Sequence, residues 1–188
     1  DSNADSDAMS AHAVIEEHLA RGRLDPADAM VGLLLEQNSG DALAHIFAAR
    51  ISASRGKVDD GIVRLEKLLG TNPRVPDALA WLAVLWRKKG DRDRALLLAR
   101  RAVALGSKVG DCDLMLGDDA LERGDIVEAG SFYDRAIARN ARLVRAWIGR
   151  GQVRRRRNQL ADAEECFARA VELDPKDKEG WLDLIETE

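Results

Sequence analysis

Apolar residues recur along this chain at the three- and four-residue spacing of amphipathic helices, and short polar turns interrupt them at regular distances. The pattern predicts helices throughout and no strand. Helix boundaries drawn from such a pattern carry an uncertainty of about two to four residues. We expect helices at residues 9–20, 25–37, 41–54, 58–70, 76–88, 92–105, 110–122, 126–139, 144–157, 160–173 and 177–187.

The turns between the predicted helices carry a periodic signal. Gly22, Gly56, Gly90 and Gly124 follow one another at 34-residue intervals, and Asn158 takes the next position of the series. Gly and Asn are the residues that best tolerate a left-handed backbone at the end of a helix. A fixed interval of this length indicates an array of stacked helix–turn–helix repeats.

Small and large side chains alternate within each predicted pair of helices. In the last two full repeats, a glycine on the first helix faces an alanine on the second, and an aromatic ring fills the space beside them. The members are Gly117, Ala129 and Tyr133 in one repeat and Gly151, Ala163 and Phe167 in the next. The pattern predicts a close approach of the two helices of a repeat.

Residues 144–177 contain the clearest copy of the repeat, with Trp147, Gly151, Ala163, Phe167, Ala170 and Pro175. This arrangement resembles the tetratricopeptide repeat (TPR) family, whose unit is a helix, a turn and a second helix. The copy departs from the family at Arg150 and Arg154, where a leucine and an aromatic residue are usual. The resemblance implies an all-α fold, a right-handed α-solenoid of about five repeats with a C-terminal capping helix.

The repeat interval predicts one superhelical domain, because each repeat of such an array is stabilised by its neighbours. Residues 1–7 are predicted to be a polar tail or an artificial extension. The expected repeats are residues 8–41, 42–75, 76–109, 110–143 and 144–177, followed by half a repeat at 178–188, and together they make up the domain 8–188.

Composition narrows the class of protein. With 46% hydrophobic and 33% charged residues, the chain is predicted to fold and to be soluble. A net charge of −4 and an isoelectric point near 5.5 give no general attraction to nucleic acid or to an anionic membrane. We therefore expect no nucleic-acid partner and no membrane insertion. The compartment stays open between cytoplasm and, in a bacterium, periplasm.

The sequence contains no set of side chains that predicts catalysis. His12 and His18 are six residues apart, so they do not share a helical face as a metal pair would, and His45 is isolated. Cys112 and Cys166 fall in non-equivalent helices, and we interpret both as packed residues without a disulfide. We expect no enzymatic activity, no cofactor and no metal.

The resemblance implies that the first helices of the repeats line a concave binding face. Residues 34 apart occupy equivalent places on successive first helices, and we call such a series a column. Apolar columns, among them Phe47, Trp81 and Met115, either receive the apolar side of a peptide or helix or pack between repeats, and both alternatives stay open. Polar residues beside the columns would give selectivity. The predicted partner-binding residues are Arg50, Trp81, Val84, Arg87, Leu114, Asp118, Glu122, Arg145, Ile148, Gln152 and Arg155.

The segment 142–157 contains seven arginines and no acid. Four successive arginines surround a helix, so Arg154 is expected to lie on the packed side and extend its charge to water or to an acid. The cluster forms either a basic pocket for a carboxylate-bearing partner or one side of charge pairs between repeats, and we favour the pairs. Arg87 and Arg155, separated in their column by Leu121 alone, are expected to contact a partner.

The best-known binding subclass of the family is the carboxylate clamp for acidic chaperone tails, and no successive repeats of this chain supply its set of Lys, Asn and Arg. The sequence favours a non-catalytic scaffold that holds a peptide or helix of a partner protein in the concave groove. One alternative is a regulatory or docking segment of a larger enzyme or envelope assembly. Another is a self-assembling module that forms homo-oligomers.

Overall fold

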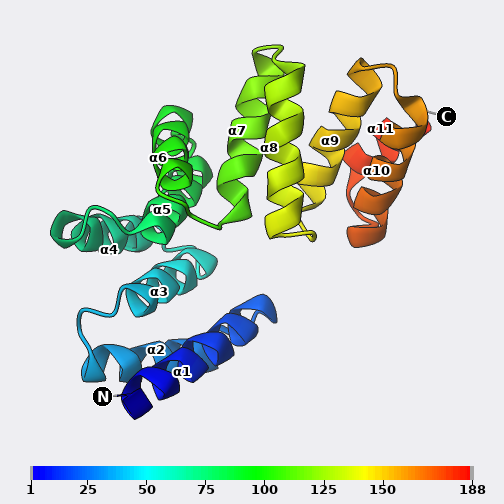
Figure 1. Cartoon of the computed structure of the whole chain (residues 1–188). Coiled ribbons are helices and arrows are strands. Elements are labelled where there is room, and N and C mark those ends of the chain that lie inside the picture. Colours follow the sequence, from blue (N-terminus) through cyan, green and yellow to red (C-terminus); the bar gives the residue numbers. More distant parts are fainter. Residues whose placement is uncertain (1, 187–188) are drawn as a thin grey trace. The chain divides into compact units, whose positions relative to one another are not determined.

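The computed structural model describes the backbone of residues 2–186 and the side chains of residues 11–186 (Figure 1). Within residues 2–186 every regular element is an α-helix, as the sequence predicts. In chain order the helices are α1 (Ser2–Ala20), α2 (Leu24–Gln37), α3 (Ala42–Ser54), α4 (Val58–Thr71), α5 (Pro76–Lys89), α6 (Arg92–Ala104), α7 (Gly110–Glu122), α8 (Ile126–Arg139), α9 (Val144–Arg156), α10 (Leu160–Leu173) and α11 (Lys178–Ile185).

The observed boundaries agree with the predicted ones to within about two residues, except at the first helix. Helix α1 begins at Ser2 instead of residue 9. The first eight residues contain neither Gly nor Pro, and polarity alone does not stop a helix, so the sequence offers no barrier there. Residue 1 of the predicted tail lies outside the described residues, as do residues 187 and 188 of the last half repeat.

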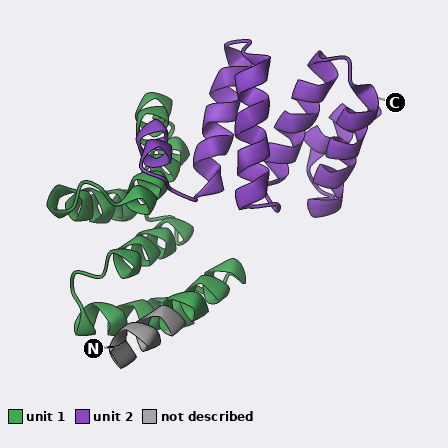
Figure 2. Ribbon diagram, viewed as in Figure 1, with its two compact units in different colours: residues 1–98 green, residues 99–188 purple. Residues whose placement is uncertain are grey.

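The chain forms two compact units, which we call the N-terminal unit (residues 1–98) and the C-terminal unit (residues 99–188); the boundary falls inside α6 (Figure 2). In the N-terminal unit α1 packs on α2 and α3 on α4, and in the C-terminal unit α7 packs on α8 and α9 on α10. First helices also contact one another, α1, α3 and α5 in one unit and α7, α9 and α11 in the other.

The predicted left-handed helix ends are confirmed. Gly22, Gly56, Gly90 and Gly124 have φ values of 69°, 83°, 92° and 80°, and Asn158 has a φ of 59°. The left-handed conformation costs a residue with a Cβ atom about 1–2 kcal/mol, which is why glycine and asparagine occupy these turns. Each such residue reverses the chain between the two helices of one repeat.

The core of the C-terminal unit depends on rings packed against glycines. Tyr133 of α8 is 1% exposed, and its ring lies between Gly117 of α7 and Gly149 of α9. A Cβ atom at Gly149 would lie 2.3 Å from Cζ of Tyr133, and one at Gly117 would lie 2.8 Å from Cε1 of the same ring. Gly151 makes the corresponding contact with Phe167. The close approach predicted from the small residues is therefore present.

The TPR family has a tryptophan near the start of the first helix of each repeat. In this chain tryptophan or histidine occupies that position in three repeats, and each side chain bonds to the turn that precedes the helix. Trp147 and Trp181 each donate a hydrogen bond from Nε1 to a carbonyl six residues earlier, that of Ala141 at 2.9 Å and that of Pro175 at 3.0 Å. His45 lies at the equivalent position, with Nε2 2.9 Å from the carbonyl oxygen of Ser39. In these three repeats the side chain at this position therefore fixes the turn before the first helix to the helix itself.

Replacing Gly149 by alanine tests the ring contact. Alanine favours a helix by about 1 kcal/mol over glycine, but the new Cβ atom displaces the Tyr133 ring, and overpacking of a core costs roughly 1–3 kcal/mol. We expect Gly149→Ala to lower the urea midpoint measured by circular dichroism. Gly32→Ala is the matched control, because no heavy atom lies within 4 Å of a Cβ there, and it is expected to raise the midpoint. Stabilisation by both substitutions would contradict the packing of the ring between the glycines.

Candidate functional site

A polar pocket of about 240 Å³ opens between α7 and α9 in the C-terminal unit. Residues 118 and 122 on α7 are one helical turn apart, and residues 145, 152 and 156 share one face of α9. Of the predicted partner-binding residues of this unit, four therefore line one cavity. The lining residues are Asp118, Leu121, Glu122, Tyr133, Arg145, Gln152 and Arg156.

Asp118 is the centre of this polar pocket. The Tyr133 hydroxyl donates a 2.9 Å hydrogen bond to Oδ1 of Asp118, and the Arg145 guanidinium lies 3.7 Å from Oδ2. Burial raises the pKa of the Tyr133 hydroxyl far above its usual value, and the Asp118 charge raises it further. The phenol therefore stays neutral and acts as a donor that holds the carboxylate in place.

Gln152, which lines the polar pocket, also contacts α11. Gln152 donates a hydrogen bond of 3.0 Å to Asp183, a carboxylate that is 7% exposed. Arg155 pairs with the same Asp183 at 2.9 Å and with Glu186 at 3.3 Å. The guanidinium of Arg155 is therefore already paired with acids of the neighbouring helix, and its contact with a partner stays a prediction.

Two cations at equivalent places of different repeats bind backbone carbonyls. Arg156 donates to the carbonyl of Leu121 at 3.1 Å, and Lys88 donates to the carbonyl of Ala53 at 2.9 Å. Both carbonyls belong to the last turn of the preceding first helix, where the negative end of the helix dipole attracts a cation. Both cations therefore cap a first helix of the preceding repeat. Glu122, the acid at the equivalent place between them in the series, also takes part in an interaction within the chain, so the expected charge pairs stay a prediction.

The apolar columns pack between repeats. Leu114 and Ile148 are only 2% and 3% exposed, and each belongs to a hydrophobic cluster of the C-terminal unit. Phe47 and Met115 are buried as well. Leu114 and Ile148 therefore present no surface to a partner, and the packing alternative describes them correctly, because aliphatic side chains gain most free energy when they leave water entirely.

The remaining predicted residues, Arg50, Trp81, Val84 and Arg87, lie in the N-terminal unit, and two of them, Arg50 and Trp81, are in contact. The Arg50 guanidinium lies 4.3 Å from the centre of the half-buried Trp81 ring and forms two hydrogen bonds, of 2.5 and 2.8 Å, with Glu16. Stacking and bidentate pairing together fix Arg50 in one orientation. Val84 is half-buried, and Arg87 takes part in an interaction within the chain.

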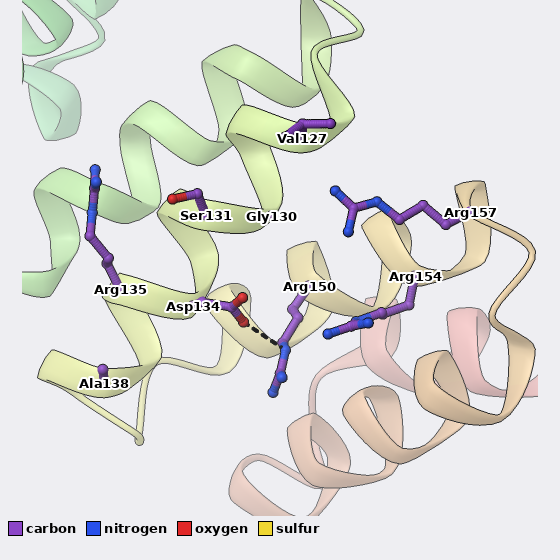
Figure 3. Close-up of a pocket in the computed structure, with 9 residues that line it drawn as sticks. All are labelled: Val127, Gly130, Ser131, Asp134, Arg135, Ala138, Arg150, Arg154 and Arg157. Carbon is purple, nitrogen blue, oxygen red and sulfur yellow. Dashed lines mark ion pairs between the residues drawn. The ribbon is translucent and has the colours of Figure 1, made fainter.

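The opposite face of α9 borders a second cavity, of about 510 Å³, which we call the arginine groove (Figure 3). Arg150, Arg154 and Arg157 lie on it, and Arg154 pairs with Asp162 at 3.4 Å, so the prediction that Arg154 faces inward to an acid is confirmed. These arginines were absent from the predicted partner-binding set, although Arg150 and Arg154 depart from the family pattern. The other lining residues are Val127, Gly130, Ser131, Asp134, Arg135 and Ala138.

Other site types find no support among the described residues. No group of three or more His, Cys, Asp or Glu side chains in residues 11–186 is placed to hold a metal ion. No helix in the described part of the chain is both long and apolar enough to cross a bilayer. His12, which bonds to Asp41 at 2.8 Å, contributes to packing between α1 and the start of α3.

Comparisons with known proteins agree with this architecture. The family model described as tetratricopeptide repeat matches residues 48–109 and 114–178. The general transcriptional corepressor trfA of Dictyostelium discoideum is 30% identical over 125 residues, which make up 65% of this chain and only 9% of that protein. The chain therefore spans a small part of the length of this relative.

Solved structures share the fold. A thermophilic TPR protein from Thermus thermophilus matches with a TM-score of 0.65 and 19% identity, over 95% of this chain and 97% of that one. YrrB, described as a TPR protein with an unusual peptide-binding site, matches with a TM-score of 0.54 and 19% identity, over 89% of this chain and 87% of that one. At these identities the similarity shows the fold alone.

The neutral phenol of Tyr133 leads to a pH-dependent prediction. Its folded pKa is raised, so the stability that depends on it is complete below the unfolded value of about 10 and is lost as the pH rises further. Tyr133 is the single tyrosine of the chain, so the ultraviolet absorbance of tyrosinate reports it alone. We expect no tyrosinate in the native protein at about pH 10.5, and substantial ionisation in urea at that pH.

The variant Asp118→Asn separates the two causes of this shift. We expect a lower native pKa for Tyr133 in the variant that still exceeds the unfolded value, because burial is the larger cause. Native and unfolded titrations that coincide in the unmodified protein would contradict the buried phenol.

Proposed function

This chain belongs to the tetratricopeptide repeat family, and we propose that it is a non-catalytic scaffold that holds a segment of a partner protein against the polar pocket of its C-terminal unit. The family and the fold are those of protein-interaction scaffolds. The observation that carries the proposal is the convergence of Asp118, Glu122, Arg145 and Gln152 on one cavity built by two successive first helices.

The chemistry of the polar pocket defines the kind of segment it takes. Asp118 and Glu122 are balanced by Arg145 and Arg156, so the lining has donors and acceptors of both signs and no large net charge. The cavity of about 240 Å³ accommodates one side chain rather than a folded element. Recognition of one polar side chain from an extended or helical segment fits this geometry, and its affinity is expected to depend weakly on salt.

The exposure of the charged members supports the same proposal. The side chain of Arg145 is 63% exposed and that of Asp118 is 27% exposed, so both are open to a ligand while Tyr133 fixes the carboxylate from behind. A preorganised carboxylate loses little conformational entropy when a donor binds to it. The peptide-binding description of YrrB is a further reason to expect a peptide segment here.

Charge reversal at Arg145 tests the proposal. Affinity purification of the full chain from its source cells, followed by mass spectrometry, is expected to recover a partner protein whose yield falls about tenfold with Arg145→Glu, since a rim charge is replaced by its opposite. Arg142→Glu is the matched control, because Arg142 is exposed, lies three residues earlier and carries the same charge. Equal recovery with both variants would rule out the polar pocket as the binding site.

Self-association is a second candidate function, and the exposed face of α11 favours it. Trp181, Leu182 and Ile185 are 44%, 59% and 65% exposed and lie within one turn of each other. If a second copy of the chain covers this face, light scattering will show a dimer whose population rises with concentration, and Leu182→Lys with Ile185→Lys will abolish it. A monomer at all concentrations in the unmodified protein would exclude this candidate.

A further inference from the structure

The arginine groove is a concave surface lined by more basic than acidic side chains. It is bounded by α8 on one side and by α9 on the other, and Figure 3 shows Arg154 and Arg157 extending from α9 toward α8. Asp134 is the one acid among the nine lining residues, against four arginines. Three of the four arginines are already paired with an acid, Arg150 with Asp134, Arg154 with Asp162 and Arg135 with Asp113. An anion inside the groove would therefore share these guanidinium groups with the acids and meet Arg157 beside them.

The arginines keep donors in reserve after their contacts within the chain. Arg150 uses Nε for an ion pair of 2.9 Å with Asp134, which leaves its two terminal amino groups (Figure 3). Arg154 contacts Gln159 and Asp162 through Nη1, and Arg157 donates to the carbonyl of Ile126 through Nη2. A guanidinium has five N–H donors, so each of these residues retains donors for a ligand.

The floor of the groove is kept open by a glycine. A Cβ atom at Gly130 would lie 3.3 Å from Cγ1 of Val153 and 3.5 Å from Nη2 of Arg157. A side chain longer than that of alanine at this position would extend toward Val153 and the guanidinium of Arg157. The absence of a side chain therefore helps Arg157 reach across to α8, where its contact with Ile126 pre-orients it.

The groove is separate from the polar pocket. Successive residues of a helix are rotated by about 100°, so Arg150, Arg154 and Arg157 fall within about 60° of one another and roughly opposite Arg145 and Gln152 on α9. One helix therefore contributes to two surfaces. A ligand in the groove and a segment in the polar pocket occupy different sides of α9, so binding in the groove does not depend on the proposed function.

We propose that the arginine groove binds an acidic peptide segment, with adjacent carboxylates paired to Arg150, Arg154 and Arg157. Carboxylates match the planar fork of a guanidinium and accept two parallel hydrogen bonds from it. The exposed apolar side chains of Val127 and Ala138 at the rim suit the aliphatic part of glutamate. Aromatic residues are missing from the nine lining residues, so the groove offers no stacking platform for the bases of a single-stranded nucleic acid.

The experiment measures binding of a fluorescein-labelled glutamate hexapeptide to the full chain by fluorescence anisotropy at low salt. The proposal predicts saturable binding that a glutamine hexapeptide does not show. Arg154→Gln with Arg157→Gln is expected to weaken binding about tenfold or more, because hydrogen bonds to charged groups are lost. Arg142→Gln with Arg169→Gln removes the same charge from exposed positions outside the groove and is expected to leave binding within about twofold.

A second variant tests the groove without removing any arginine. Ser131 is exposed and lines the groove, so Ser131→Glu places a competing carboxylate inside it and is expected to weaken binding, whereas Ser54→Glu in the N-terminal unit is not. Circular dichroism confirms that each variant is folded. Equal losses with the groove pair and the control pair would overturn the proposal, and so would tighter binding of a uridine hexanucleotide than of the glutamate hexapeptide.

Discussion

The ring of Tyr133, packed between two glycines, connects the fold of the C-terminal unit to its candidate site. Because Gly117 and Gly149 lack side chains, α7 and α9 both approach the ring closely enough to contact it. The hydroxyl then emerges at Asp118 and fixes the carboxylate that faces Arg145. The position of the pocket residues is thus a consequence of core packing, and a change in the glycines would move the polar pocket as well as the helices.

Much of the fold follows from local rules that are visible in the sequence. The interval between Gly22, Gly56, Gly90 and Gly124 predicts the turns because only glycine and asparagine adopt their backbone conformation at low cost. The start of α1 was not predictable in the same way. Its first residue is set by the absence of glycine and proline, which would end a helix, and not by a residue that starts one. A polar composition suits both a helix and a tail.

The candidate site was predictable where residues 34 apart in the sequence contact one cavity. It was not predictable where a residue of one repeat contacts a non-equivalent residue of the next. The interval placed Asp118 and Gln152 in one column, and both line the polar pocket. It left Arg155 without an acid in its column, whereas its partner in the structure is Asp183 of α11, which does not occupy an equivalent position. Side chains lean toward the amino end of their helix, so contacts between repeats need not join equivalent residues. Apolar columns have a further ambiguity, because Leu114 has the same pattern whether it is covered by a neighbour or by a ligand.

The charge of α9 shows how an arginine-rich helix is accommodated in a chain of net negative charge. Acids from three different helices surround it: Asp134 of α8 pairs with Arg150, Asp162 of α10 with Arg154, and Asp183 of α11 with Arg155. Each acid pairs with an arginine on a different side of α9, so the arginines of this helix do not form a single basic patch. Ligand binding at each face of α9 would then depend on the number of arginines and acids on that face. The face toward α11 is neutralised by Asp183 and Glu186, whereas the face toward α8 retains an excess of guanidinium groups around Asp134. The two proposed sites therefore lie on different sides of one helix, and their arginines, although chemically identical, have different neighbouring acids.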